Sequence, residues 1–572
     1  MGRGIYSDIR CPTVAHSTFI PLQHQLDALE YFLRSPYKGL LLYWKLGSGK
    51  SCEAILIADS MLKKKMINRV YVLTPGALRE GWINEYCKIC GSDATTLEKY
   101  FTFITYNYMV KELPNLDGGL VIIDEIHNLI NGAKNMSKYP TIIYNTILNS
   151  NCRVLALSGT PIYNYVYEFA LLGRLLKPGD EFPEIRKKGG TIDEQAFMKL
   201  FSVDGFGNLT PKNLTSLKRR LEGLVSFYPG AGLEYMPEII EMEPIKVKMS
   251  ITQETYYWEK FIQESILDHP PDKSLLYTDP STYDLLRKLY VMARKKILTR
   301  SVSNFYYPSD AIKRRDIPGP YIIGTEKLVL TPLKEAELEV KLEEDEKKKS
   351  PGDSPGWVNK KNFSEGQLKI YSPKLTAFLI NLVAHNLQKH VLFTFFKTKA
   401  GAYLIKSVLD ICGISAEIFS GDLDDSKRRS LLKKFNSEEN RYGKLIKVLI
   451  ITEAGVEGVS LLETRHMHIF ESSPRMNKTV QAIGRIARFK SHTNLPLEER
   501  TVKIWRYWSV SSSSKPVTIK TTLINTDGKE EAVTKVITDK RSVDQKLYSQ
   551  GMQTIRKINS FLDILKEVSV TK

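Results

Sequence analysis

The sequence predicts an α/β fold in which two parallel-sheet domains are separated by a mostly helical inserted module. Short apolar runs alternate with helical patterns up to about residue 180, and the same alternation resumes near residue 366. Strands separated by helical stretches pair in parallel, because each crossover helix covers one face of the sheet. The predicted domains are 1–180, 181–365, 366–510 and a C-terminal hairpin and helix at 511–572.

The first domain is predicted to begin with a helix and to contain at least four buried strands. Leucine and aromatic residues at 26–33 have the spacing of an amphipathic helix. Four short apolar runs follow at 39–44, 70–74, 120–124 and 154–158. Their continuous apolar character predicts strands that are covered by helices on both faces of the sheet.

Between the two alternating regions the strand pattern is lost. Helical patterns occur at 193–225 and 252–300, and a charged stretch with prolines and glycines at 343–356 predicts a mobile connector. This region therefore predicts an inserted helical module followed by a linker.

The second alternating region and the C-terminal segment complete the predicted fold. Strands are predicted at 391–396, 415–419, 447–452 and 466–470. The last seventy residues predict a hairpin around 525–528, where Asn, Asp and Gly favour a turn, and a helix at 542–567.

The composition is that of a folded protein with a strong positive charge. The chain has 572 residues, of which 42% are hydrophobic and 26% charged, and this length allows three or four domains. Its formal net charge is +18. Such a charge favours a polyanionic partner, most often nucleic acid, and a charge that serves solubility alone is the alternative.

The cysteines and the apolar segments indicate the cellular environment in which the chain is expected to fold. Six cysteines are too few and too scattered to predict a disulfide framework. Cys87 and Cys90 form a lone C-x-x-C, for which reduced thiols are favoured over a zinc site. Apolar runs of membrane-spanning length and a signal-peptide core are absent from the sequence. These features predict an intracellular, soluble chain.

A glycine-rich segment at 45–51, Lys-Leu-Gly-Ser-Gly-Lys-Ser, predicts a phosphate-binding loop. Glycines let the backbone curl so that successive N–H groups face a polyphosphate. Lys50 would reach the β and γ oxygens, and the Ser51 hydroxyl would bind Mg²⁺. Trp44 stands where the common pattern has glycine, so an ordinary strand–turn–helix is the alternative. The predicted nucleotide-binding residues here are Leu46, Gly47, Ser48, Gly49, Lys50, Ser51 and Cys52.

An acidic pair at a strand end supports the prediction of nucleotide chemistry. The apolar residues 121–123 place Asp124 at the C-terminal edge of a parallel strand, where ligands bind in open α/β sheets. Asp124 would hold Mg²⁺, and Glu125 would polarise the attacking water. Two solvated acids at a strand end are the alternative. Together the loop and the pair predict an NTP-hydrolysing motor.

The motifs, taken in order, resemble those of superfamily 2 helicases and translocases, which consist of two RecA-like domains. They cover most of residues 22–490. The segments that carry the resemblance are Gln25, Thr74–Gly76, Asp124–His127, Ser158–Thr160, Phe393–Lys397, Thr452–Ser460 and Gln481–Arg488.

Within that superfamily, residues 157–162, 175–179 and 488–492 are similar to one viral group. It contains the nucleoside triphosphate phosphohydrolase I and the early transcription factor small subunit of large cytoplasmic DNA viruses, and it is Snf2-like. The segments 542–548 and 561–565 share this likeness. The resemblance implies a role in viral transcription, in the virion and host cytoplasm, with a viral RNA polymerase or transcription-factor subunit as partner.

The resemblance also implies how the chemistry is divided between the lobes. One ATP with Mg²⁺ would bind in the cleft between them. Lys50, Asp124 and Glu125 would act from the first lobe. Arg485 and Arg488 would act from the second lobe and stabilise charge on the γ-phosphoryl group.

Further residues receive roles from the resemblance alone. Gln25 and Gln481 would contact the nucleotide, Gln25 through the adenine. Coupling of nucleotide state to movement is implied for His127, Ser158 and Thr160, with a buried core histidine as the alternative for His127. Nucleic-acid contacts are implied for Thr74, Pro75, Gly76, Lys397, Thr452 and Gly458, with a merely solvated Lys397 as the alternative.

The leading hypothesis is a nucleic-acid-dependent ATPase that couples hydrolysis to movement on DNA or RNA. A helicase that separates strands is a second hypothesis within the same class. The hypothesis from a different class is a non-motor transcription-factor or virion subunit that keeps the fold and hydrolyses little ATP.

Overall fold

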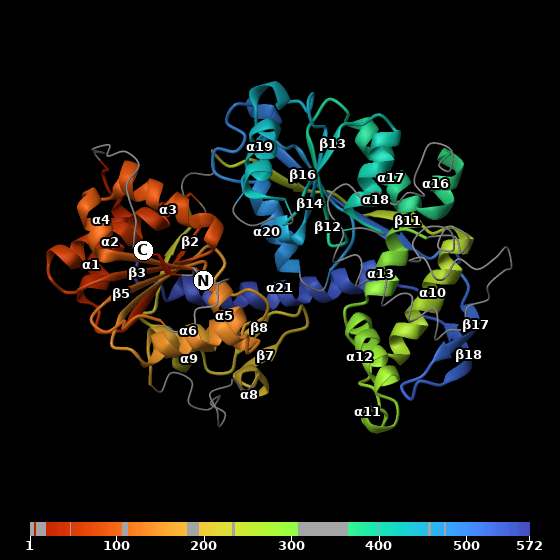
Figure 1. Cartoon of the computed structure of the whole chain (residues 1–572), viewed down its shortest axis with the longest axis horizontal. Helices are drawn as coiled ribbons and strands as arrows, with labels where there is room; N and C mark the ends of the chain where they lie inside the picture. The colour runs from red at the N-terminus through yellow and green to blue at the C-terminus, as the bar shows by residue number, and fades with distance from the viewer. Residues whose placement is uncertain are drawn as a thin grey trace. The chain divides into compact units, whose positions relative to one another are not determined.

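The chain, described here by a computed structural model, forms two compact units, each built around its own sheet (Figure 1). One unit comprises Met1–Leu233 with Met552–Lys572, and the other comprises Glu234–Gly551. The structure describes residues 5–6, 19–45, 47–105, 113–179, 194–230, 235–306, 364–397, 400–421, 423–455, 459–473 and 476–571. The predicted connector at 343–356 and the predicted site residues Leu46 and Gly458 lie outside the described residues.

The first unit contains a seven-stranded sheet in the order β1-β4-β3-β5-β6-β2-β9. Its strands are β1 (Ile5–Tyr6), β2 (Gly39–Trp44), β3 (Val70–Thr74), β4 (Phe101–Thr105), β5 (Leu120–Asp124), β6 (Arg153–Ser158) and β9 (Val225–Tyr228). All neighbouring pairs are parallel except β1 and β4. The four strands predicted for this domain are confirmed.

Successive residues of the central strands face two different apolar layers. In β2, Leu41 belongs to the layer on one face and Leu42 to the layer on the other, and both are fully buried. The helices around this sheet include α1 (Gln23–Arg34), α2 (Lys50–Lys63), α5 (His127–Lys134), α6 (Lys138–Asn149) and α7 (Glu168–Leu176). Because both faces are covered, the strand sequences are continuously apolar.

The second unit contains a parallel sheet in the order β10-β16-β15-β12-β14-β13, with β11 also paired to β16. Its strands are β10 (Glu238–Glu241), β11 (Ile245–Lys248), β12 (His390–Thr394), β13 (Ala416–Phe419), β14 (Val448–Thr452), β15 (His466–Ile469) and β16 (Thr501–Val510). Its helices include α17 (Pro373–Ala384), α18 (Ala402–Ile411), α19 (Asp425–Phe435) and α20 (Met476–Ile486). Two parallel sheets with helices confirm the predicted α/β fold of two RecA-like domains.

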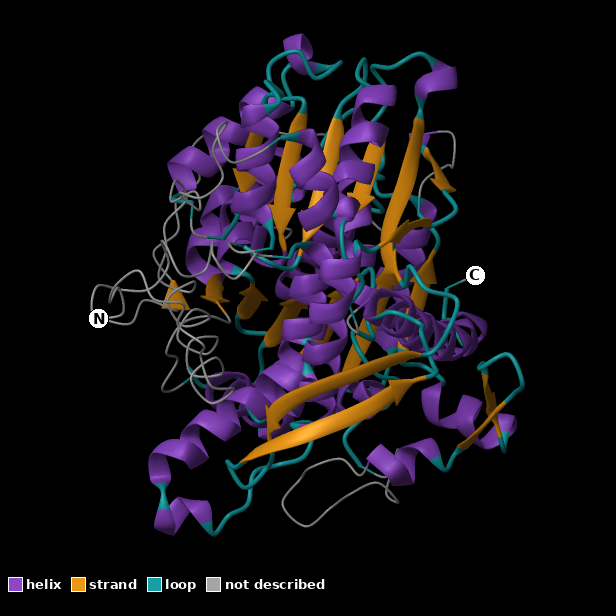
Figure 2. Ribbon diagram, turned by 90° about the vertical axis from the view of Figure 1, so that its right-hand side faces the viewer, coloured by secondary structure: helices purple, strands orange, loops and turns teal. Residues whose placement is uncertain are grey.

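A helical module and a long hairpin pack together within the second unit, and Figure 2 shows the paired strands. The elements are α10 (Ile251–Ile266), α11 (Leu275–Thr278), α12 (Pro280–Arg294), α13 (Ile297–Asn304), β17 (Val517–Ile524) and β18 (Glu530–Ile537). Ile519 and Leu523 of the hairpin share an apolar cluster with Trp258 of α10. Gln263 Nε2 donates to the Ile524 carbonyl at 3.0 Å. The hairpin predicted around 525–528 is therefore part of the core of this module.

The boundaries of the units differ from the predicted domain limits. The helical module was expected from residue 181, but residues 194–228 belong to the first unit, where β9 pairs with β2. This segment consists of α8 (Glu194–Met198), β7 (Phe201–Val203), β8 (Leu209–Pro211), α9 (Leu214–Leu221) and β9. The predicted C-terminal helix is α21 (Val543–Glu567), which begins in the second unit and ends in the first.

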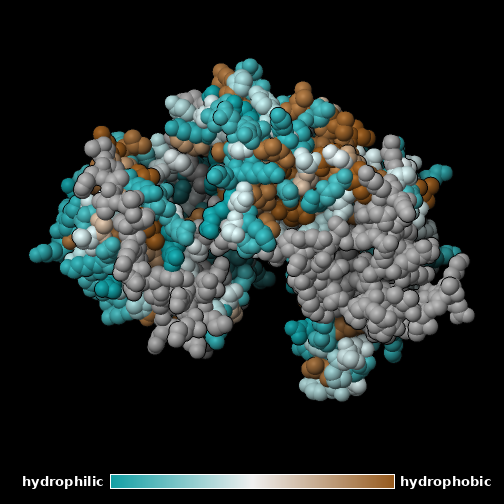
Figure 3. All heavy atoms as spheres, turned by 45° about the horizontal axis from the view of Figure 1, so that its top comes forward, coloured by the Kyte–Doolittle hydropathy of each residue, from teal (hydrophilic) through white to brown (hydrophobic). Residues whose placement is uncertain are grey.

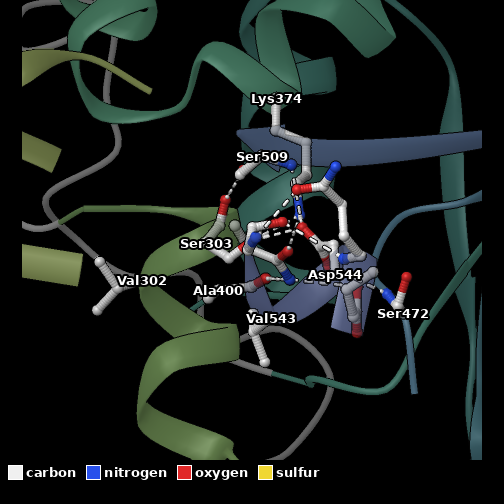
Figure 4. Close-up of polar contacts among 12 residues, drawn as sticks. Val302, Ser303, Lys374, Ala400, Ser472, Ser509, Val543 and Asp544 are labelled. Carbon is white, nitrogen blue, oxygen red and sulfur yellow. Dashed lines mark hydrogen bonds and ion pairs between the residues drawn. The ribbon is translucent and has the colours of Figure 1, made fainter. Parts of the chain in front are cut away.

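A buried ion pair and its hydrogen bonds join five parts of the second unit (Figure 4). Lys374 Nζ lies 2.7 Å from Asp544 Oδ2, and both side chains are 0% exposed. The same carboxylate accepts hydrogen bonds from the Ser303 hydroxyl at 2.7 Å and the Ser509 N–H at 3.0 Å. Its other oxygen accepts from the Ser472 N–H at 3.2 Å. The start of α21 is thereby fixed to α13, α17, β16 and the segment after β15.

Buried histidines of β12 and β15 contact one another and aromatic side chains of β16. His390 Nδ1 lies 3.0 Å from His468 Nε2, and His468 Nδ1 lies 2.9 Å from the Tyr507 hydroxyl oxygen. Trp505 Nε1 donates to His466 Nδ1 at 3.0 Å. Burial, together with neighbouring histidines and cations, lowers the pKa of His390 to about 3 and that of His466 to about 2. The cluster is therefore neutral in the folded chain.

Mild acid is expected to destabilise the second unit through this cluster. The unfolded histidines have a pKa near 6.5, so below that pH the unfolded chain binds protons that the folded cluster does not. The free energy of unfolding has its full value above about pH 6.5. Below that pH it falls by about 1.4 kcal/mol per pH unit for each such histidine. For His390 and His466 together the loss at pH 5 is about 4 kcal/mol.

Urea unfolding between pH 7.5 and pH 5, followed by hydrogen exchange of β12 and β15, measures this loss. A variant with His390→Asn and His466→Gln should show a shallower dependence of stability on pH. An unchanged slope in that variant would contradict the assignment of the acid sensitivity to these two side chains.

The surface in Figure 3 mixes hydrophilic and hydrophobic residues. The exposed large apolar side chains include Ile380 and Val383 of α17 and the nearby Leu387. Of the helices that the structure describes, none combines the length and the apolar character needed to cross a membrane.

Candidate nucleotide-binding site

The glycine-rich loop joins β2 to α2 at the C-terminal edge of the first sheet. Gly47 and Gly49 both have φ of +77°, a left-handed conformation that favours glycine. A Cβ at Gly49 would also lie 3.0 Å from Gln25 Nε2. The first N–H groups of α2 have no partner within the helix and carry its positive dipole end, so this geometry suits a phosphate.

The loop accommodates Trp44, which stands where the common pattern has glycine. Lys50 Nζ donates to the Trp44 carbonyl at 2.9 Å and to the Lys45 carbonyl at 3.1 Å. The Trp44 side chain is fully buried, and its Nε1 donates to the Ser226 hydroxyl at 2.8 Å. The indole therefore packs in the apolar layer on one face of the sheet, while the Trp44 carbonyl contacts the lysine.

Two residues of α1 lie against the loop. Gln25 Nε2 donates to the Gly49 carbonyl at 3.3 Å, and its Oε1 accepts from the Leu22 N–H at 2.9 Å. His24, which the sequence did not single out, stacks on Tyr228 with 3.6 Å between ring centres. Its Nε2 lies 3.2 Å from the Ser48 carbonyl oxygen. The sequence does not indicate that Tyr228 lies near the loop, because this depends on the pairing of β9 with β2.

The acidic pair lies at the end of β5, at the same edge of the sheet as the loop. Asp124 Oδ2 accepts hydrogen bonds from Trp82 Nε1 at 2.9 Å and from the Thr74 hydroxyl at 3.3 Å. Glu125 has φ of +50°, which is uncommon for a residue with a side chain and is concentrated at functional sites. The chain thus turns sharply directly after the strand.

The electrostatics of the site favour a cation. Burial, together with the neighbouring Glu125 carboxylate, raises the pKa of Asp124 to about 6. Burial also raises the pKa of Glu85, and the Ser51 hydroxyl partly opposes this shift. A bound divalent cation would offset both effects.

The donor set fits magnesium, although no group of three acidic, histidine or cysteine side chains in the described parts of the chain could hold a metal unaided. Magnesium keeps several waters and takes one or two carboxylates plus phosphate oxygens. The Asp124 carboxylate and the Ser51 hydroxyl are hard oxygen donors of this kind.

The predicted coupling residues meet around Glu125. His127 Nδ1 lies 3.4 Å from Glu125 Oε2 and 3.3 Å from the Ser158 hydroxyl oxygen. The Thr160 N–H donates to that same hydroxyl at 3.0 Å. The His127 ring also stacks on Tyr163 with 5.2 Å between centres. His127 is thus buried, as the alternative required, and also lies beside the acid.

The residues predicted to contact nucleic acid occupy different environments. Thr74 is fully buried, and its hydroxyl donates a hydrogen bond to Asp124. The Thr74 side chain therefore faces the nucleotide site rather than the surface. Gly76 is exposed and Pro75 is half-buried. Thr452 is buried at the end of β14, and Lys397 is half-buried after β12.

The arginines of the last motif lie at and just after α20. Arg488 Nη1 donates to the Ser460 hydroxyl at 2.5 Å, and its Nε donates to the Gly484 carbonyl at 3.2 Å. Arg485 and Gln481 are half-buried on the helix. Within the second unit, the structure therefore brings the last motif against Ser460.

Cys90 of the C-x-x-C pair differs from the expectation of reduced thiols. Cys52 in the first turn of α2 forms a disulfide with Cys90. The expectation of a reduced thiol is therefore wrong for Cys90. It failed because the sequence does not show that the π-helical turn Tyr86–Cys90 packs on α2.

Comparison with known proteins bears on this site. Residues 374–490 match the model of the helicase conserved C-terminal domain. A protein of Acanthamoeba polyphaga mimivirus, provisionally named ATP-dependent RNA helicase R563, is 24% identical, with 86% of this chain and 84% of the relative covered. The termination factor NPH-I homolog of African swine fever virus (isolate Tick/Malawi/Lil 20-1/1983) is 23% identical, with coverage of 93% and 76%. The nucleoside triphosphatase I of Melanoplus sanguinipes entomopoxvirus is 25% identical, with coverage of 82% and 70%.

Proposed function

We propose that the chain, which is similar to helicases and nucleoside triphosphatases of large DNA viruses, is a nucleic-acid-dependent ATPase of the superfamily 2 helicase type acting in viral transcription. The observation that carries the proposal is the grouping of the Lys50 loop with Asp124 and Glu125 at one edge of the first sheet. The left-handed backbone at Glu125 supports it, because such strain is kept where a side chain must be aimed.

In this proposal the first unit binds the nucleotide and prepares the water. The α2 amides and Lys50 hold the phosphates, while Ser51 and Asp124 hold Mg²⁺. When held by Ser51 and Asp124, Mg²⁺ would supply positive charge that stabilises the phosphates. Glu125 polarises the attacking water, and His127 fixes the orientation of that carboxylate through the 3.4 Å contact.

The second unit is proposed to supply Arg485 and Arg488 to the γ-phosphoryl group, where guanidinium groups stabilise developing charge. Hydrolysis then requires the two units to close, and product release permits reopening. This cycle is proposed to drive movement along DNA or RNA, with Gly76 and Lys397 among the contacts to the nucleic-acid backbone.

The net charge of +18 supports a polyanionic track. The name of the African swine fever virus relative as a termination factor homolog supports a role in transcription. We propose a viral RNA polymerase or a transcription-factor subunit as partner, and activity in the virion or host cytoplasm.

Steady-state ATPase assays with no nucleic acid, single-stranded DNA, duplex DNA and RNA test the proposal. One polymer should stimulate the rate, and Lys50→Ala should lower it by about 10²–10³-fold because a phosphate-binding cation is lost. Lys63→Ala, at the other end of α2, is the matched control and should keep the wild-type rate. Negligible turnover with every polymer would overturn the proposal and favour a non-motor subunit.

A further inference from the structure

The helix α3 (Arg79–Glu85) lies beside the nucleotide site, and the proposed mechanism assigns it no role. It follows β3 after the 3-10 turn Gly76–Leu78 and continues into the π-helical turn Tyr86–Cys90. Trp82, at its centre, is 4% exposed and belongs to the same apolar layer as Ile55 of α2. An indole in that layer could serve packing alone. Whether Trp82 has a further role depends on the contact that its N–H group makes.

The indole N–H of Trp82 is directed at the proposed metal ligand. Trp82 Nε1 donates to Asp124 Oδ2 at 2.9 Å. The Thr74 hydroxyl donates to the same oxygen at 3.3 Å. Two donors on one oxygen oppose rotation of the carboxylate about its Cβ–Cγ bond. An indole nitrogen can only donate, so this contact stabilises the ionised form of Asp124.

The segment that carries Trp82 is firmly attached to α2, the helix that carries Ser51. The Tyr86 hydroxyl donates to Asp59 Oδ1 at 3.0 Å, and the Ser92 N–H donates to Asp59 Oδ2 at 2.8 Å. The disulfide between Cys52 and Cys90 joins the same two elements. The position of Trp82 is therefore set by the phosphate-binding helix itself.

We propose that Trp82 is a positioning residue for the magnesium-binding carboxylate of Asp124, and that α3 holds this carboxylate in a fixed position relative to α2. This inference rests on the proposed function of the site. Groups that orient a metal ligand typically affect metal affinity by 10–100-fold when removed. The expected signature is therefore a change in metal dependence rather than a loss of folding.

The variant Trp82→Phe keeps an aromatic ring and removes the N–H donor. The Mg²⁺ concentration for half-maximal ATPase at saturating ATP is expected to rise about tenfold. Binding of ATP without metal should not change. Trp82→His, which regains an N–H donor, should recover part of the metal affinity. Trp505→Phe, which removes an indole donor to His466 in the second unit, is the matched control and should keep the wild-type midpoint.

A readout that does not need hydrolysis separates this inference from the proposed function. Binding of Mn²⁺ to the complex with a non-hydrolysable ATP analogue, followed by electron paramagnetic resonance, should weaken by a similar factor in Trp82→Phe. A Trp82→Phe variant with lower thermal stability but wild-type Mg²⁺ and Mn²⁺ midpoints would make Trp82 a packing residue and overturn the inference. A wild-type chain that binds Mn²⁺ with nucleotide but hydrolyses no ATP would overturn the proposed function alone, and the Mn²⁺ comparison would still decide the role of Trp82.

Discussion

Replacement of Lys374 by methionine is expected to destabilise the second unit by about 3–5 kcal/mol, because it leaves the Asp544 carboxylate buried without its cation. Both side chains are 0% exposed and the ion pair is 2.7 Å long. Removal of one partner from a buried ion pair destabilises a protein strongly, because it leaves the other charge buried and unpaired. Replacement of both partners by apolar residues has a much smaller effect. Chemical denaturation followed by hydrogen exchange of β12 and β16 measures the effect within this unit.

The design of the control follows from the other bonds of Asp544. Its oxygens also accept the Ser472 and Ser509 N–H groups, so an apolar residue at 544 would leave these donors unsatisfied. Asp544→Asn keeps an acceptor without the charge. The double variant Lys374→Met with Asp544→Asn should therefore recover part of the stability lost in Lys374→Met.

An exposed ion pair in the same unit provides the comparison. Lys406 Nζ lies 3.0 Å from Asp410 Oδ1 on α18 with both side chains partly exposed. Lys406→Met is expected to change stability by less than about 1 kcal/mol. Equal effects of the two lysine substitutions would contradict the importance of burial at Lys374.

Four strands of each sheet could be predicted from sequence, because burial on two faces leaves a continuous apolar run. The run at 120–124, for example, is β5 with the predicted limits. The β7 and β8 strands have only three residues each, and only the first residue of each is buried, so they carry little apolar signal. The assignment of β9 to the first sheet depends on pairing with β2, a long-range contact that local patterns do not contain.

The candidate site was predictable where its chemistry lies within one short motif. Lys50 follows a strand and two glycines, and Asp124 follows three apolar strand residues. Trp82 and Tyr228 act through contacts with other segments, and nothing in their neighbours marks them. The same holds for Lys374 and Asp544, which are 170 residues apart and meet only in the folded chain.

Substitution of Arg485 by alanine is expected to slow ATP hydrolysis by about 10³-fold or more, since an arginine finger contributes about 10³–10⁵ in rate. Arg488→Ala should have an effect of the same order. Nucleotide binding should be retained in both variants, because the phosphate loop belongs to the first unit. Single-turnover hydrolysis with enzyme in excess, together with binding of a fluorescent ATP analogue, separates these two quantities.

The contact between Arg488 and Ser460 allows a finer test of the same mechanism. Ser460 accepts from Arg488 Nη1 at 2.5 Å, so Ser460→Ala removes a hydrogen bond that orients the guanidinium while the charge remains. Hydrolysis should slow by about tenfold, the loss expected for one hydrogen bond to a charged group. Arg541→Ala, which removes an exposed arginine paired with Asp539, should hydrolyse ATP at the wild-type rate. If Arg485→Ala and Arg488→Ala bind and hydrolyse ATP as Arg541→Ala does, the arginines are structural and catalysis does not require the second unit.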